Sequence, residues 1–305
     1  MFSTINKTNE EIMMYSLYHD YKKFENLSKK YSNGSKIFNI SSENFLAATT
    51  IVPLLCFAET NNVEQILTHS NTSEFVDRIL NKRETSTTKP FVNLPTTKKE
   101  FLEQEIPTKI AEKIDENYGG GYTIKCIGEE IIGNIYNHTP LEEGYANQGY
   151  SFAQEYVNVP YLDICVMDDG LSIPGNFEKH GIDFADDCDA ISKAIEGITT
   201  AKNEYNDPRY SRGHGLWTVL RLVIEGNGGE ALIVSRQGCL HIPNNNSHNY
   251  YKLKNKNIFK GTLISLRLTR KLVENYYDLL EISHNRTKYK YKPIKTPING
   301  GLNDD

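Results

Sequence analysis

The stretch LDICVMDDGLSIP, residues 162–174, decides how the rest of the chain is interpreted. Residues 162–167 are mostly apolar, which predicts a buried strand. That strand runs directly into an acidic turn containing Asp168 and Gly170. A carboxylate at a strand end can accept a hydrogen bond from the exocyclic amino group of adenine, whereas guanine has a carbonyl oxygen there. The plainer interpretation is an ordinary turn, because Asp and Gly are common in turns.

A polar stripe lies on the helix that we predict upstream, over residues 122–138. Glu130, Asn134 and His138 follow one another at intervals of four, and this spacing places them on one helix face. An amide oxygen suits Mg²⁺, and a carboxylate near a water molecule can act as a general base. The simpler alternative is a solvated helix face.

Two glycine motifs follow downstream. Gly213 and Gly215 precede an apolar helix predicted over residues 216–224, and a helix N-terminus with accessible N–H groups can bind phosphate. Gly261 and Thr262 open a strand predicted over residues 262–268. Each motif alone is a weak signal.

The order and spacing of these four elements closely resemble the ATP-binding boxes of the GHKL superfamily. This superfamily includes gyrase B, MutL, sensor histidine kinases and anti-sigma-factor serine kinases. The resemblance covers about residues 98–270. It implies a Bergerat-type domain of the α/β class, an α+β two-layer sandwich of helices on a mixed, mostly antiparallel sheet. It also implies ATP and Mg²⁺ as ligands.

The resemblance assigns a role to each matching residue. Glu130 would be the catalytic residue that positions or activates the attacking water, and Asn134 would coordinate Mg²⁺. Asp168 would hold the adenine amino group, and Thr262 would join that contact through its hydroxyl or a water. The remaining expected nucleotide contacts are Gly170, Ile173, Lys202, Arg212, Gly213, His214, Gly215 and Leu216.

Two residues depart from the family pattern. Ser172 stands where the family usually has the second glycine of its box, and we expect serine to be tolerated unless the position requires a positive φ. Trp217 replaces a commoner small residue. It would reshape the base of the ATP lid, which the resemblance places, together with its helix, at residues 189–202 and which ends at Gly213 and Gly215.

The family resemblance leaves the type of protein open. His19-Asp20 lacks the proline expected near the phosphoacceptor of a sensor histidine kinase, and the helix stripe is most similar to that of anti-sigma-factor serine kinases. Three functions remain: a regulatory kinase or switch acting on a partner protein, an ATPase whose hydrolysis drives conformational or dimer switching, and an ATP-sensing interaction module. A protein partner or substrate is expected, and a homodimer is open.

We predict three regions. Residues 1–95 form a small α/β regulatory or dimerisation domain with a linker, and residues 35–82 faintly resemble a STAS fold with a strand over 35–40, a helix over 43–60, a strand near 63–67 and a helix over 73–82. Residues 96–270 form the ATP-binding domain, whose further elements are helices over 98–117 and 186–197 and a hairpin over 230–242. Residues 271–305 form a helix and a flexible basic tail.

Composition and charge restrict the expected ligands and the expected cellular compartment. The net charge of −5 gives no strong nucleic-acid signal. The number of cysteines, five, is odd, which favours a reducing cytoplasm over a disulfide framework. The apolar stretch at residues 45–58 is shorter than the ~20 residues that cross a bilayer, so we expect a buried helix and no membrane contact. We also expect no signal peptide, since the N-terminus lacks a basic region followed by an apolar one.

Overall fold

The structure is a computed structural model, and it describes residues 15–32, 34–80, 92–93, 102–138, 149–156, 158–197, 215–254, 260–273 and 276–280. Its helices are α1 (Leu17–Lys29), α2 (Ala48–Thr60), α3 (Ser70–Leu80), α4 (Leu102–Lys113), α5 (Gly121–His138), α6 (Ser172–Lys179), α7 (Asp187–Ile195), α8 (Gly215–Leu220), the π-helix η3 (Arg221–Gly226) and α9 (Tyr276–Leu280). Its strands are β1 (Ile37–Ile40), β2 (Gln65–Thr68), β3 (Val92–Asn93), β4 (Gly149–Glu155), β5 (Tyr161–Asp168), β6 (Glu230–Ser235), β7 (Gly238–Ile242), β8 (Asn249–Lys252) and β9 (Thr262–Thr269).

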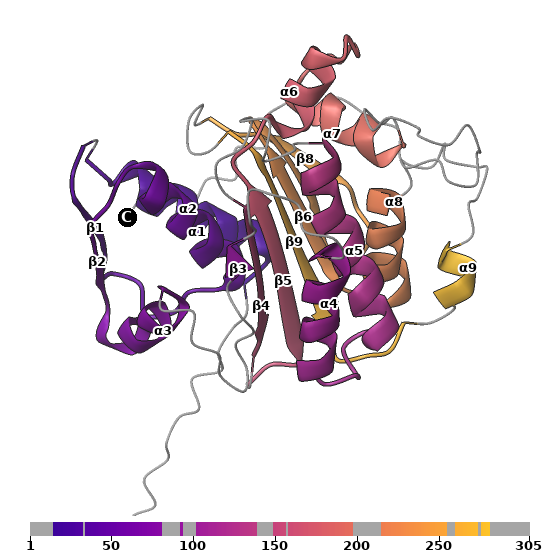
Figure 1. Cartoon of the computed structure of the whole chain (residues 1–305), viewed down its shortest axis with the longest axis horizontal. Helices are drawn as coiled ribbons and strands as arrows, with labels where there is room; N and C mark the ends of the chain where they lie inside the picture. The colour runs from indigo at the N-terminus through magenta and orange to yellow at the C-terminus, as the bar shows by residue number, and fades with distance from the viewer. Residues whose placement is uncertain are drawn as a thin grey trace, which may run out of the picture.

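The main sheet has the order β3-β4-β5-β9-β6-β7-β8, and each neighbouring pair in it is antiparallel. A separate small sheet pairs β1 with β2 in parallel, and α2 connects them. Figure 1 shows the main sheet nearly edge-on, with α4, α5 and α8 on one face and α1 and α2 on the other. The predicted α+β sandwich of helices on a sheet is therefore confirmed, but the described strands of the main sheet are all antiparallel rather than mixed, and helices cover both of its faces rather than one.

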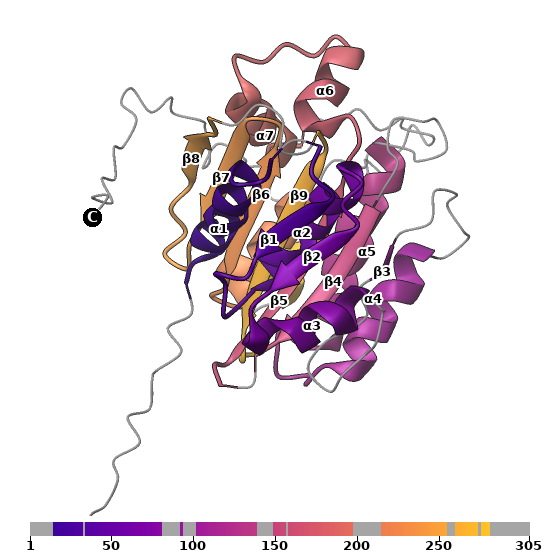
Figure 2. The ribbon, with the colours of Figure 1, turned by 90° about the vertical axis from the view of Figure 1, so that its left-hand side faces the viewer.

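The second helical layer is the part of the architecture that the sequence did not predict. Figure 2 looks onto this layer, where α1, α2 and the small sheet lie in front of the main sheet. Apolar residues of α1 and α2, such as Phe24 and Leu54, share one buried cluster with Phe152 of β4 and Met167 of β5. The predicted boundary between residues 95 and 96 lies outside the described residues, as do residues 281–305.

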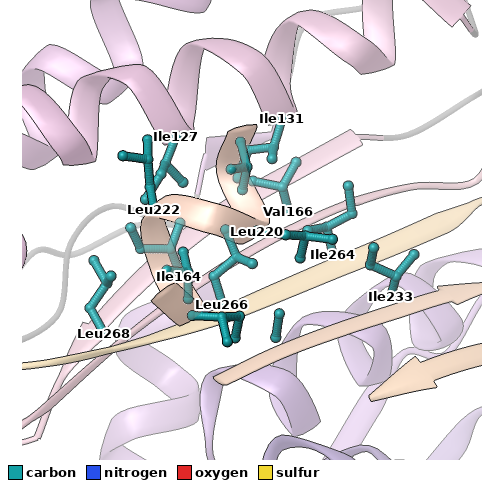
Figure 3. Close-up of a cluster of buried hydrophobic side chains, with 14 of the residues drawn as sticks. Ile127, Ile131, Ile164, Val166, Leu220, Leu222, Ile233, Ile264, Leu266 and Leu268 are labelled. Atoms are coloured by element: carbon teal, nitrogen blue, oxygen red, sulfur yellow. The ribbon is translucent and has the colours of Figure 1, made fainter. Parts of the chain in front are cut away.

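Strand β5 shows how the two layers are joined. Successive side chains of a strand point to opposite faces, and both faces of β5 are buried. Ile164 and Val166 belong to the cluster under α5, whereas Cys165 and Met167 belong to the cluster under α2. Figure 3 shows the first cluster, with Ile131 of α5 above Val166. Each such fully buried apolar side chain contributes about 1.5–3 kcal/mol relative to exposure.

Several element boundaries differ from the prediction. Helix α2 begins at Ala48, five residues after the predicted start at 43, and α3 begins at Ser70, three residues before the predicted start at 73. The predicted helix over 98–117 is the shorter α4, which ends at Lys113. The predicted hairpin, the strand at 162–167 and the final strand are confirmed as β6–β7, β5 and β9. Among the described residues, no helix has the length and apolar content that crossing a bilayer requires.

Candidate nucleotide site

The candidate site lies at one end of the main sheet, where three strands bring predicted and unpredicted residues together. In the antiparallel register, Ser235 at the end of β6 pairs with Thr262 at the start of β9. Met167, next to Asp168 at the end of β5, pairs with Leu263 of β9. The sheet therefore places the acidic turn beside the Gly-Thr motif, although almost a hundred residues separate them along the chain.

Asp168 is buried, with 4% of its surface exposed. Its Oδ1 accepts a hydrogen bond of 2.8 Å from the backbone N–H of Gly170, and the backbone N–H of Thr262 also donates to this carboxyl group. Burial raises the pKa of Asp168 to about 7, and the donated hydrogen bonds offset that effect only in part.

Gly261 is the residue that lets the two motifs meet. A Cβ atom at this position would lie 2.0 Å from the backbone carbonyl oxygen of Asp168. That distance is far inside van der Waals contact with backbone, so a side chain here would push β9 away from the acidic turn. The Gly-Thr pair of the fourth motif therefore has a specific packing role next to Asp168.

Two hydroxyl groups complete this end of the sheet. The Ser235 Oγ accepts a hydrogen bond of 2.9 Å from the backbone N–H of Ile173, and it lies 3.0 Å from the Thr262 Oγ1. Ile173 itself packs partly buried against the core under α5. Sequence reasoning did not identify Ser235, and the only available signal was a polar residue at the end of an apolar strand.

The first and third motifs meet on the helical layer. A Cβ atom at Gly215, the first residue of α8, would lie 1.8 Å from a carboxylate oxygen of Glu130 on α5. The absence of a side chain at Gly215 thus allows the Glu130 carboxylate to lie against the start of α8. Asn134 lies one turn further along α5 and is half-buried.

The apolar core connects the contact between Asp168 and Gly261 with the contact between Glu130 and Gly215. Ile131 follows Glu130 on α5, and Val166 lies two residues before Asp168 on β5. Both belong to the same buried cluster, in which they lie close together (Figure 3). Leu216 and Trp217 of α8 also pack against this cluster, partly buried. Trp217 therefore helps to anchor the start of α8.

Ser172 has a positive φ, the one case in which we expected serine not to be tolerated at this position. Its φ is 72°, in the left-handed region that glycine adopts without strain. The Ser172 Oγ accepts a hydrogen bond of 3.2 Å from the backbone N–H of Gly175, which caps the first turn of α6. At the position where the resemblance predicts a glycine, the chain thus has a serine with a positive φ whose hydroxyl caps the first turn of α6.

Several expected contacts fall on residues that the structure does not describe. Lys202, Arg212, Gly213 and His214 lie outside the described residues, as does the side chain of His138. Among the residues that are described, no group of three or more His, Cys, Asp or Glu side chains is arranged to hold a metal ion. A nucleotide-bound Mg²⁺ usually takes one or two protein oxygens together with phosphates and water, and the Asn134 amide oxygen fits that kind of ligand set.

No protein-family model matches the chain, and no curated protein matches it.

Proposed function

We propose that the chain binds Mg·ATP at the end of the main sheet marked by Asp168 and Thr262, and that it acts as a regulatory kinase or switch on a partner protein. The observation that carries the proposal is the pairing of motifs that are distant in sequence. Asp168 lies against Gly261 and Thr262, and Glu130 lies against Gly215. This pairing supports the resemblance to GHKL proteins, in which the corresponding boxes surround one nucleotide.

In this proposal the base is recognised at the sheet end. The ionised Asp168 carboxylate accepts a hydrogen bond from the exocyclic amino group of adenine, and burial strengthens that interaction. Asn134 holds Mg²⁺, which neutralises charge on the phosphates during phosphoryl transfer. The start of α8 faces the phosphates with its backbone N–H groups.

The position of Glu130 favours phosphoryl chemistry over passive sensing. Its carboxylate lies at the N-terminus of α8, the proposed phosphate-binding end. In this proposal it orients a water or a hydroxyl nucleophile. The same position serves a kinase or an ATPase. Phosphate release without any partner would favour the ATPase, and label transfer to a protein would favour the kinase.

The binding test is a calorimetric titration of the protein with Mg·ATP. We expect saturable binding of ATP and none of GTP. The matched variant is Asp168→Asn, which keeps the size of the side chain but can turn an amide donor towards the adenine amino group. Wild-type affinity in a folded Asp168→Asn protein would contradict the adenine assignment.

The chemical test uses Glu130→Gln with Glu129→Gln as its control. Glu129 is the preceding residue of α5 and points about 100° away around the helix. We expect Glu130→Gln to retain ATP binding and to lose phosphate release or transfer by about 10²–10⁴-fold, the usual contribution of a general base. Equal rates in Glu130→Gln and Glu129→Gln would remove Glu130 from the chemistry.

A further inference from the structure

The hydroxyl groups of Ser235 and Thr262 form a hydrogen bond, and the burial of the two residues determines which hydroxyl is the donor. The two oxygens lie 3.0 Å apart, so one hydroxyl donates to the other. Ser235 has none of its surface exposed, whereas Thr262 is partly exposed. The Ser235 Oγ already accepts from the backbone N–H of Ile173.

If Thr262 donated to Ser235, the Ser235 hydrogen would need another acceptor inside the protein. Within the described part of the chain, the side-chain partners of Ser235 are the Ile173 N–H and the Thr262 Oγ1. A buried hydroxyl hydrogen without an acceptor is costly. Ser235 therefore donates to the Thr262 Oγ1, and the Thr262 hydrogen is turned away from Ser235.

We infer that Ser235 makes Thr262 a hydrogen-bond donor beside Asp168 and thereby determines which purine the site accepts. The inference rests on the proposed function. The Thr262 backbone N–H donates to the Asp168 carboxyl group, so Thr262 and Asp168 are immediate neighbours. The site then presents an acceptor, the Asp168 carboxylate, next to a donor, the Thr262 hydroxyl.

This arrangement of acceptor and donor is complementary to adenine, and mismatched to guanine, at both the exocyclic group and N1. Adenine presents its amino group as a donor and the neighbouring ring nitrogen N1 as an acceptor. Guanine presents a carbonyl oxygen as an acceptor and its N1–H as a donor. Without Ser235, the Thr262 hydroxyl could rotate and either donate or accept. Ser235 is thus a positioning residue that acts on the base through Thr262, either directly or through one bound water.

The experiment compares ATP with 1-deaza-ATP, in which a C–H group replaces N1. Wild-type protein should bind ATP about five- to tenfold more tightly than 1-deaza-ATP, as expected for one hydrogen bond. In Ser235→Ala this ratio should fall to about twofold or less, mainly because ATP affinity falls. A purely structural role would weaken both ligands equally and leave the ratio unchanged.

Two further variants keep the test decisive. Ser265→Ala is the matched control, because Ser265 is also a buried serine of the main sheet paired with a threonine, Thr49, at 2.6 Å. It should leave the ratio at its wild-type value. Thr262→Val should abolish the preference for N1, and adding Ser235→Ala to it should change the ratio no further.

The outcomes separate the inference from the proposed function. A reduced ratio in Ser235→Ala, with a wild-type ratio in Ser265→Ala, supports the inference. An unchanged ratio in Ser235→Ala, or equal wild-type affinities for ATP and 1-deaza-ATP, overturns the inference while leaving ATP binding intact. Failure of the wild-type protein to bind either nucleotide overturns the proposed function, and the inference with it.

Discussion

Strand β5 carries two buried aspartates, Asp163 and Asp168, whose surroundings differ. Asp163 has none of its surface exposed and receives two hydrogen bonds from Arg267, at 2.7 and 2.8 Å, and one from the Tyr156 hydroxyl at 2.9 Å. Asp168 is almost as buried, but its donors are backbone N–H groups, and no cation among the described residues forms an ion pair with it.

The difference shows how one strand separates a structural carboxylate from a candidate functional one. Burying a charge is costly unless an opposite charge and hydrogen bonds compensate. Arg267 compensates Asp163 and also reaches the Asp20 carboxylate at 3.3 Å and the Tyr15 carbonyl at 2.6 Å, so it joins α1 to the sheet. Asp168 has backbone donors but no such cation among the described residues, and its pKa is raised to about 7.

The largest predicted effect is on stability, and it concerns Arg267, the ion-pair partner of Asp163. Arg267→Met should lower the free energy of unfolding by about 3–5 kcal/mol, because it leaves a buried carboxylate without its cation. Urea denaturation measures the change. The control is Arg270→Met, since Arg270 forms an exposed ion pair with Asp115 and exposed pairs contribute little. Equal stability of the two variants would show that the Asp163 cluster is not structural.

Asp168→Asn should have the opposite profile to Arg267→Met, with a large loss of ATP binding and little change in stability. It should weaken ATP binding by at least about a hundredfold, because a site built to accept a hydrogen bond then presents a donor. Its free energy of unfolding should change by no more than about 1 kcal/mol, since removing an uncompensated buried charge offsets the altered hydrogen bonds. Calorimetry and urea denaturation of the same preparation test both parts. A loss of stability as large as that of Arg267→Met would place Asp168 among the structural carboxylates.

The pH dependence of adenine binding should test whether Asp168 is the hydrogen-bond acceptor for the base. Only the ionised carboxylate of Asp168 is a pure acceptor, and burial raises its pKa to about 7. Affinity should therefore be highest above pH 7 and should fall about tenfold for each pH unit below it. Adenosine is the ligand to titrate, because the terminal phosphate of ATP itself titrates with a pKa of about 6. Constant adenosine affinity between about pH 5.5 and 8.5 would exclude Asp168 as the acceptor.

The elements that carry the site could be predicted from the sequence because each has a strong local pattern. The apolar runs at 162–167, 230–235 and 262–268 are strands, and the predicted helix over 122–138 differs from α5 by one residue. Helix α6 was not predicted, because it contains Pro174 and Gly175 and begins at a serine with positive φ. These residues are typical of turns, and tertiary packing overrides their preference here.

The side-chain contacts that hold the site and the sheet together could not be predicted, because they depend on pairing between strands that are distant in the sequence. Ser235 and Thr262 are 27 residues apart, and Arg267 and Asp163 are 104 residues apart. No local pattern of hydrophobic residues specifies either contact. The packing of α1 and α2 on the second face of the sheet was missed for the same reason, since each helix alone shows only that it has apolar residues to bury.

The smallest predicted effect concerns Ser172, four residues beyond Asp168 and at the end of the same turn. Its φ of 72° costs a residue with a Cβ about 1–2 kcal/mol, whereas replacing a capping serine by glycine costs only about a few tenths of a kcal/mol. Ser172→Gly should therefore raise the free energy of unfolding by about 1 kcal/mol and leave ATP affinity unchanged. Asn62→Gly is the control, because Asn62 has a φ of 52° and asparagine adopts this region more readily. A gain in ATP affinity alongside stability would mean that strain at Ser172 holds the acidic turn away from its binding conformation. A loss of affinity would mean that the cap on α6 positions Asp168, and the functional carboxylate would then depend on the strained serine beside it.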